Sequence, residues 1–220
     1  MPFVLKNFWY VNMGKPQLNE IFNTADFVRF SQIEKILMND NLPNGSIAEL
    51  GVYRGRLTKL LAKVASQRNR QLFLFDTFSG FNSADMKTEK ENGLNTYFEN
   101  FAGTDVSKIH RICISAGMPA NNIKIKSGWF PESLDEEASN ESFAFVSLDF
   151  DLYKPTIDAL NRLYDNVTDG GFIAVHDYGN KRYKGVKKAT DEFVEQRDIK
   201  FCLELCDYCG TMLIKKVKQC

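Results

Sequence analysis

Regular alternation of short apolar runs with amphipathic stretches, from about residue 46 onward, constrains the fold of this chain most strongly. Short runs bounded by turn residues predict strands, and apolar spacing of three and four predicts helices. The predicted strands span 46–50, 72–75, 123–126, 144–148, 172–175, 201–205 and 211–214. The predicted helices span 26–38, 57–66, 106–117, 156–163 and 186–197.

This alternation, at roughly 30 residues per unit, predicts an α/β fold with a mostly parallel sheet and helices on both faces. The last two strands have no helix between them, so the final strand is expected to be antiparallel. We expect one domain over 46–220, preceded by an N-terminal cap or helical segment over 1–45. A polar insertion is expected at about 78–105.

Charge and hydropathy exclude some classes of function. The chain has 28 basic and 28 acidic residues, so it lacks the broad basic excess that nucleic-acid binding usually requires. It has no apolar run of roughly 18 residues, as a membrane span needs, and its start does not resemble a signal peptide. We therefore expect a cytoplasmic protein that acts on a small molecule, without nucleic-acid or membrane partners. It could form a homo-oligomer.

Three of the five cysteines have the spacing Cys202-x3-Cys206-x2-Cys209, by which radical enzymes hold an iron–sulfur cluster. Their flanks predict two strands joined by a short turn, close to the C-terminus. We interpret them as ordinary hairpin cysteines. No fourth cysteine or histidine follows at zinc-finger spacing.

The turn after the first predicted strand contains Glu49, Gly51, Tyr53 and Gly55. A dinucleotide-binding turn needs glycine where Tyr53 stands, because the backbone there approaches the pyrophosphate. This turn instead suits an adenosine ligand without phosphates, and Glu49 could pair with an ammonium group. Asp76 ends the second predicted strand and could accept hydrogen bonds from ribose hydroxyls. Its alternative role is that of a helix-capping or turn residue.

Two further strand ends carry acids. Asp149 and Asp151 follow the fourth predicted strand, and His176 and Asp177 follow the fifth. Residues 132–151 contain seven acids and no lysine or arginine, so nothing nearby in sequence neutralises them. Gathered carboxylates bind a divalent cation or repel one another, and we favour the cation over solvated carboxylates. An imidazole ligand would suit manganese, iron, nickel or zinc better than magnesium, or His176 could act as a base.

Several motifs occur together in one order and resemble the macrocin-type O-methyltransferases, a class I family that uses S-adenosylmethionine. They are the Glu49–Gly55 turn, Asp76–Phe81, Gly128–Phe130, Leu148–Tyr153, Gly170–Ile173 and His176–Tyr178. The resemblance covers about residues 47 to 215. It implies a seven-stranded Rossmann-like domain and metal-assisted methylation of a hydroxyl, commonly on a sugar of a natural product.

The resemblance also implies roles for individual residues. Glu49, Gly51 and Tyr53 would surround the methionine part of the cofactor, and Asp76 would hold the ribose. Ser127, Gly128 and Trp129 would border the adenine. Asp149 would face the cofactor and, with Asp177, bind the divalent cation, magnesium first and manganese or another ion second. His176 stands where the family usually has another acid, and we include it among the predicted metal ligands.

These residues suggest in-line transfer of the sulfonium methyl group to an alcohol oxygen, with Asp149 or His176 as the catalytic proton acceptor. A metal-dependent methyltransferase acting on a catechol or phenol would share the same core and is the first alternative. A cofactor-binding module without catalysis is the second. No Asn/Asp-Pro-Pro-aromatic motif points to methylation of a nucleic-acid amine.

Overall fold

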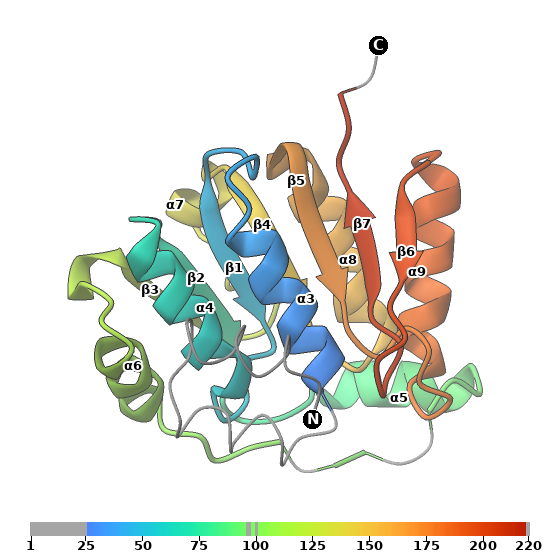
Figure 1. Ribbon diagram of the computed structural model, residues 1–220. Coiled ribbons are helices and arrows are strands. Elements are labelled where there is room, and N and C mark those ends of the chain that lie inside the picture. Colours follow the sequence, from blue (N-terminus) through green and yellow to red (C-terminus); the bar gives the residue numbers. More distant parts are fainter. Residues whose placement is uncertain (1–25, 96–97, 100, 219–220) are drawn as a thin grey trace.

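The apolar runs form one seven-stranded sheet with the order β3-β2-β1-β4-β5-β7-β6, seen in the computed structural model of Figure 1. The structure describes residues 26–95, 98–99 and 101–218. Strands β1 to β5 run parallel, and β7 is antiparallel to both of its neighbours. The strands are β1 (Ser46–Leu50), β2 (Leu72–Asp76), β3 (Ile123–Ser127), β4 (Phe143–Leu148), β5 (Val167–Val175), β6 (Cys202–Glu204) and β7 (Met212–Lys215). The predicted Rossmann-like class I fold is confirmed.

Helices cover both faces of the sheet. Three of them share one apolar core with the sheet, and three others share a second core on the opposite face. The first group comprises α3 (Phe27–Leu37), α4 (Arg56–Gln67) and α6 (Val106–Ser115). The second comprises α7 (Glu136–Ser139), α8 (Tyr153–Leu163) and α9 (Lys184–Gln196). Strands β1 and β4 are buried along their whole length, as expected for parallel strands covered on both faces.

The segment before β1 is partly described. Phe30, Ile33 and Leu37 of α3 are buried in the same core as β1 and α4, so residues 26–45 form a layer of the domain. The rest of the predicted cap, residues 1–25, lies outside the described residues. Within residues 26–95, 98–99 and 101–218, no helix has the length and apolar character needed to cross a membrane.

Several elements differ from the sequence-based expectation, among them the short helix α7, which was not predicted. The predicted insertion at 78–105 contains a helix, α5 (Ser83–Glu91), which lies beneath the carboxyl ends of the strands in Figure 1 and contacts α8. The polar sequence of α5 lacks the apolar spacing that predicts a helix. Asn82 caps the helix by accepting a hydrogen bond from the N–H of Ala84. Strand β5 begins at Val167 rather than at 172, with its irregular start paired to β4 across a register shift.

Candidate active site

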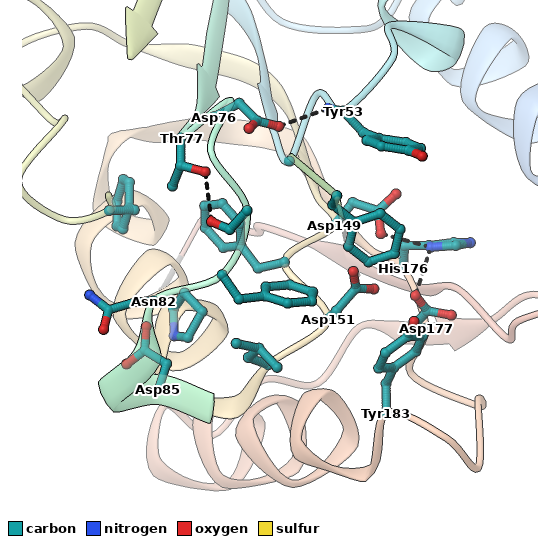
Figure 2. A pocket seen from close by; sticks show the side chains of 18 of the residues that line it. Tyr53, Asp76, Thr77, Asn82, Asp85, Asp149, Asp151, His176, Asp177 and Tyr183 are labelled. Atoms are coloured by element: carbon teal, nitrogen blue, oxygen red, sulfur yellow. Dashed lines mark hydrogen bonds and ion pairs between the residues drawn. The ribbon is translucent and has the colours of Figure 1, made fainter. Parts of the chain in front are cut away.

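A cavity of about 380 Å³ lies at the carboxyl ends of the parallel strands (Figure 2). Its wall is built by residues that follow β1, β2, β3, β4 and β5, and by the turn between β6 and β7. The strand order reverses between β1 and β4, and open α/β sheets bind ligands at such a switch point. The polar strand-end residues picked out by the sequence therefore lie where a ligand is expected.

Gly51 lets the chain leave β1 close to the end of β4. Its φ is +88°, and a Cβ placed there would lie 2.0 Å from the backbone oxygen of Asp149. The two strand ends are also joined by a 2.8 Å hydrogen bond from the Asp149 N–H to the Leu50 carbonyl. Any side chain at this position would push the strand ends apart, so glycine is required for both conformation and space.

Asp76 joins two turns and also lines the cavity. Its carboxylate accepts the N–H of Tyr53 at 2.7 Å and the N–H of Phe78 at 2.7 Å. The turn role foreseen as an alternative is therefore present. Each carboxylate oxygen has a second lone pair, so Asp76 can still accept ribose hydroxyls. The ribose role stays a prediction that the geometry permits.

Glu49 and Ser127 are not among the residues that line this cavity. Glu49 is 2% exposed and accepts a 2.6 Å hydrogen bond from the Thr58 hydroxyl of α4. Burial raises its pKa to about 8. Gly128 does line the cavity, as does the half-exposed Trp129. The ammonium-binding role of Glu49 and the adenine-binding role of Ser127 remain predictions.

Asp149, His176 and Asp177 come together at one corner of the cavity. One potential ligand atom from each lies within 4.8 Å of the others. His176 Nδ1 is 2.9 Å from Asp149 Oδ1 and 3.2 Å from Asp177 Oδ2 (Figure 2). Burial and Arg29 oppose protonation of the imidazole, but Asp149 and Asp177 raise the pKa of His176 well above its usual range.

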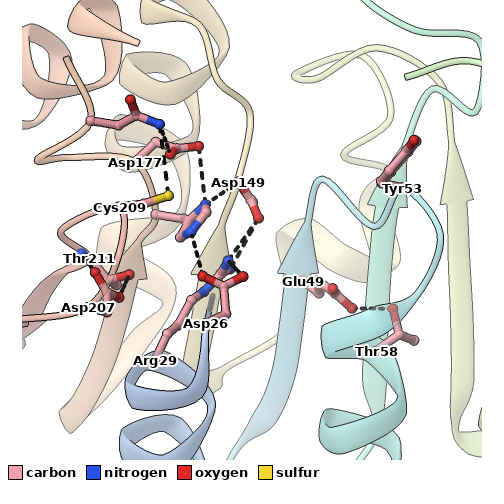
Figure 3. Close-up of polar contacts among 12 residues, drawn as sticks. Asp26, Arg29, Glu49, Tyr53, Thr58, Asp149, Asp177, Asp207, Cys209 and Thr211 are labelled. Atoms are coloured by element: carbon pink, nitrogen blue, oxygen red, sulfur yellow. Dashed lines mark hydrogen bonds and ion pairs between the residues drawn. The ribbon is translucent and has the colours of Figure 1, made fainter. Parts of the chain in front are cut away.

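Arg29, which is distant in sequence, neutralises Asp149, although residues 132–151 contain no lysine or arginine. Its two terminal nitrogens lie 3.2 and 3.1 Å from Asp149 Oδ2, and the side chain is 3% exposed (Figure 3). The partners are 120 residues apart, so the acidic stretch alone could not reveal the pair. One feature of the sequence could have indicated a buried arginine: Arg29 stands four residues before Ile33, on the apolar face of α3.

Asp26 and Cys209 also reach His176, and sequence reasoning missed both. The Asp26 Oδ1 atom lies 3.6 Å from His176 Nε2, and Cys209 lines the cavity. One ligand atom each from Asp26, His176 and Cys209 lies within 4.8 Å of the others. Cys209 lies in the turn of the predicted hairpin, whose strands β6 and β7 pair, and it also lines the cavity. Cys202 and Cys206 are exposed and belong to neither of the described metal-capable groups.

Asp151 completes the acidic corner. It is 9% exposed, and burial together with Asp149 and Asp177 raises its pKa well above the usual range. Burial opposes ionisation of Asp177, but hydrogen bonds with His176, Asp151 and Asn180 lower its pKa. The surroundings thus favour the protonated form of Asp151 and the ionised form of Asp177. A divalent cation would add positive charge to this acidic corner.

The donor set fits a divalent cation that accepts nitrogen. Asp149 and Asp177 offer carboxylate oxygens, and His176 offers the imidazole nitrogen Nδ1, which faces both of them. Magnesium favours an all-oxygen shell, whereas manganese, iron, nickel and zinc accept imidazole. The residues thus fit a metal, with the ion selected by His176.

Comparison with known proteins agrees with this architecture. The chain is 28% identical over 172 residues to the mycinamicin III 3''-O-methyltransferase of Micromonospora griseorubida, covering 72% of this chain and 67% of that protein. It is 28% identical over 184 residues to the demethyldecarbamoylnovobiocin O-methyltransferase of Streptomyces niveus, covering 76% of this chain and 64% of that protein. Each relative extends beyond the matched part.

The structure of the O-methyltransferase NovP superposes with a TM-score of 0.68 at 23% identity, covering 86% of this chain and 80% of NovP. This likeness concerns the fold. The family model of the macrocin-O-methyltransferases (TylF) matches residues 22–215, which include every strand and helix that the structure describes. The chain belongs to the macrocin-O-methyltransferase (TylF) family.

Proposed function

We propose that this chain transfers a methyl group from S-adenosylmethionine to a hydroxyl of a sugar, on a natural product or a glycan precursor. The observation that carries the proposal is that one cavity is lined by Gly51 and Asp76 as well as by Asp149 and His176. The names of the two curated relatives, both O-methyltransferases of natural products, support the same reaction.

The cavity fits the cofactor in size and chemistry. Its volume of about 380 Å³ falls within the range of small-molecule sites. Gly51 and Tyr53 line the part of the cavity that would face the amino-acid part, and Asp76 offers carboxylate oxygens to the ribose. Trp129 presents an indole ring against which an adenine can stack. When bound, the sulfonium cofactor supplies an electrophilic methyl group.

The acceptor hydroxyl must lose its proton as the carbon–oxygen bond forms. Asp149 faces the cavity, and its Oδ1 atom keeps a lone pair after bonding to His176, whereas Oδ2 accepts hydrogen bonds from both terminal nitrogens of Arg29. Arg29 and His176 hold this carboxylate in one orientation, which favours proton transfer from a correctly placed hydroxyl. We assign Asp149 as the proton acceptor and His176 as its hydrogen-bonded partner in catalysis.

A divalent cation at this corner would act as a Lewis acid that makes the acceptor hydroxyl more acidic. Asp149, His176 and Asp177 would hold it. Dialysis against a chelator, followed by return of magnesium, manganese or zinc, measures this dependence. Methyl transfer that survives chelation undiminished would eliminate the metal from the proposed function.

The acceptor class can be tested by offering sugar nucleotides, glycosides, catechols and simple phenols side by side with S-adenosylmethionine. We expect methylation of a sugar hydroxyl, and we expect Asp149→Asn to abolish it while Asp158→Asn, a surface variant on α8, leaves it unchanged. Turnover of phenols alone would replace the sugar proposal with the phenol alternative. Calorimetric cofactor binding without turnover on any acceptor would instead indicate a non-catalytic module.

A further inference from the structure

His176 has one ring nitrogen that the arrangement around Asp149 and Asp177 does not use. The side chain is 8% exposed, and its Nε2 atom has no hydrogen-bond partner among the described residues. A buried polar atom in this state is rare unless an ion or a water completes it. Nε2 lies on the side of the ring that faces Asp26, 3.6 Å from Oδ1.

The opposite ring nitrogen has the partner that a metal-binding histidine needs. Nδ1 lies 2.9 Å from Asp149 Oδ1, and Asp149 is itself fixed by Arg29. Histidine ligands ordinarily donate their second N–H to a carboxylate, which fixes the tautomer and the ring orientation. In that tautomer the proton resides on Nδ1 and Nε2 carries the free lone pair.

Asp26 is placed like a helix cap but does not act as one. It occupies the N-cap position of α3, where an aspartate side chain usually accepts a backbone N–H of the first turn. Here the side chain makes no capping hydrogen bond. Its carboxylate instead lies 3.6 Å from His176 Nε2, and Figure 3 shows it near Arg29.

Cys209 is held at the same point by the turn between β6 and β7. The Gly179 N–H donates a 3.0 Å hydrogen bond to the Cys209 carbonyl, and a Cβ on Gly210 would lie 2.7 Å from the Gly179 Cα. Asp207 accepts hydrogen bonds from the Thr211 N–H and hydroxyl at 2.9 and 2.6 Å, which closes the turn. The thiol therefore reaches the site on a fixed loop.

We propose that Asp26 Oδ, His176 Nε2 and Cys209 Sγ bind a divalent ion of the zinc class, distinct from the oxygen-rich magnesium site that the family resemblance implies. Ligands about 2.0–2.2 Å from a tetrahedral ion lie roughly 3.4 Å apart, close to the 3.6 Å between Asp26 and His176. A thiolate and an imidazole select zinc, cobalt or nickel over magnesium.

The charges of the two anionic ligands match a divalent ion. Arg29 offsets Asp149, while the Asp26 carboxylate and the Cys209 thiolate together match two positive charges. Three protein ligands leave a fourth position for water or substrate, as in catalytic zinc sites. His176 and Cys209 line the cavity, so that position opens toward it. Binding of a metal ion at this site does not depend on methyl transfer. Only the suggestion that an acceptor hydroxyl would occupy the fourth ligand position rests on the proposed function.

The test is direct metal binding by the purified full chain. Cobalt(II) added to chelator-treated protein should produce a thiolate-to-cobalt charge-transfer band, and zinc should displace it. We expect the band in the native chain and in a Cys202→Ser/Cys206→Ser variant, in which both exposed hairpin cysteines are removed. Cys209→Ser should abolish the band, and Asp26→Asn should weaken zinc binding by about tenfold or more in calorimetry.

A band that persists in Cys209→Ser would overturn the proposal, as would a native chain that binds no zinc. Zinc binding that is lost in Asp177→Asn but unchanged in Cys209→Ser would place the ion on the other nitrogen of His176 and would also overturn it. Circular dichroism of each variant confirms that it is folded. Failure of methyl transfer would leave these binding results unaffected, so the two proposals are separable.

Discussion

Replacing Arg29 by methionine tests whether this buried cation holds the acidic corner together. Arg29 contributes two nitrogen contacts to Asp149 Oδ2, at 3.2 and 3.1 Å, and a weaker ion pair with Asp26 at 3.8 Å. Methionine keeps the apolar part of the side chain and removes only the charge and its donors. The variant therefore isolates the electrostatic contribution.

The distances and burial set the expected magnitude. At 3.1 Å and an effective dielectric constant of about 20, the charge pair is worth about 5 kcal/mol before desolvation is counted. Removing one partner of a buried pair typically costs about 3–5 kcal/mol. The Asp149 side chain is 26% exposed, so water recovers part of the loss. We expect the free energy of unfolding to fall by about 3 kcal/mol.

Urea denaturation of a double-mutant cycle with Arg29→Met and Asp149→Asn measures the effect. The coupling energy should be about 2 kcal/mol, because removal of both charges leaves neither one buried and unpaired. Arg197→Met is the matched control: its pair with Asp165 spans 3.0 and 3.1 Å, but the two side chains are 37% and 66% exposed. That change should cost under about 1 kcal/mol. Equal losses from the two arginine variants, or additive cycle energies, would show that the buried Arg29–Asp149 pair does not stabilise the fold.

Three further predictions concern other positions. Gly51→Ala should destabilise the fold by about 3 kcal/mol or more in thermal unfolding, because the new Cβ would overlap the backbone of Asp149. The control Gly93→Ala, at a glycine with φ +64° and open space around it, should cost about 1 kcal/mol. Equal losses of stability in the two variants would contradict this prediction. Burial raises the pKa of Glu34 from 4.5 to about 7, so ionisation destabilises the fold as pH rises through this window. Glu34→Gln should therefore leave the free energy of unfolding unchanged at pH 4 and raise it at pH 8 by about 1 kcal/mol, after screening by solvent is allowed for. Urea denaturation at the two pH values measures this difference. A larger gain at pH 4 than at pH 8 would show that the pKa of Glu34 is not raised in the folded state. Asp76→Asn should weaken calorimetric binding of S-adenosylhomocysteine by about tenfold or more, and unchanged affinity would remove Asp76 from the cofactor site.

The fold was predictable because its strongest signals are local. Alternating apolar runs placed all seven strands and the antiparallel pairing of β7. The polar helix α5 was missed because its sequence has almost no buried face, Glu89 being its buried residue. The early start of β5 was missed because Gly170 and Gly171 resemble a turn in sequence.

The candidate site was predictable only where strand topology brings residues together. Asp149 and His176 follow neighbouring parallel strands, so their proximity follows from the sheet. Arg29 and Cys209 come from a covering helix and from a hairpin turn, whose docking depends on packing between distant segments. The sequence pattern also could not predict the direction in which side chains point. Glu49, for example, extends toward Thr58 of α4.

We propose that methyl transfer to a sugar hydroxyl takes place in the cavity at the carboxyl ends of the strands. S-adenosylmethionine with an isotopically labelled methyl group tests this reaction when nuclear magnetic resonance locates the label in the product. We expect the label on one sugar oxygen, with none incorporated by Asp149→Asn. A folded native chain that binds the cofactor and leaves every sugar hydroxyl unlabelled would contradict it.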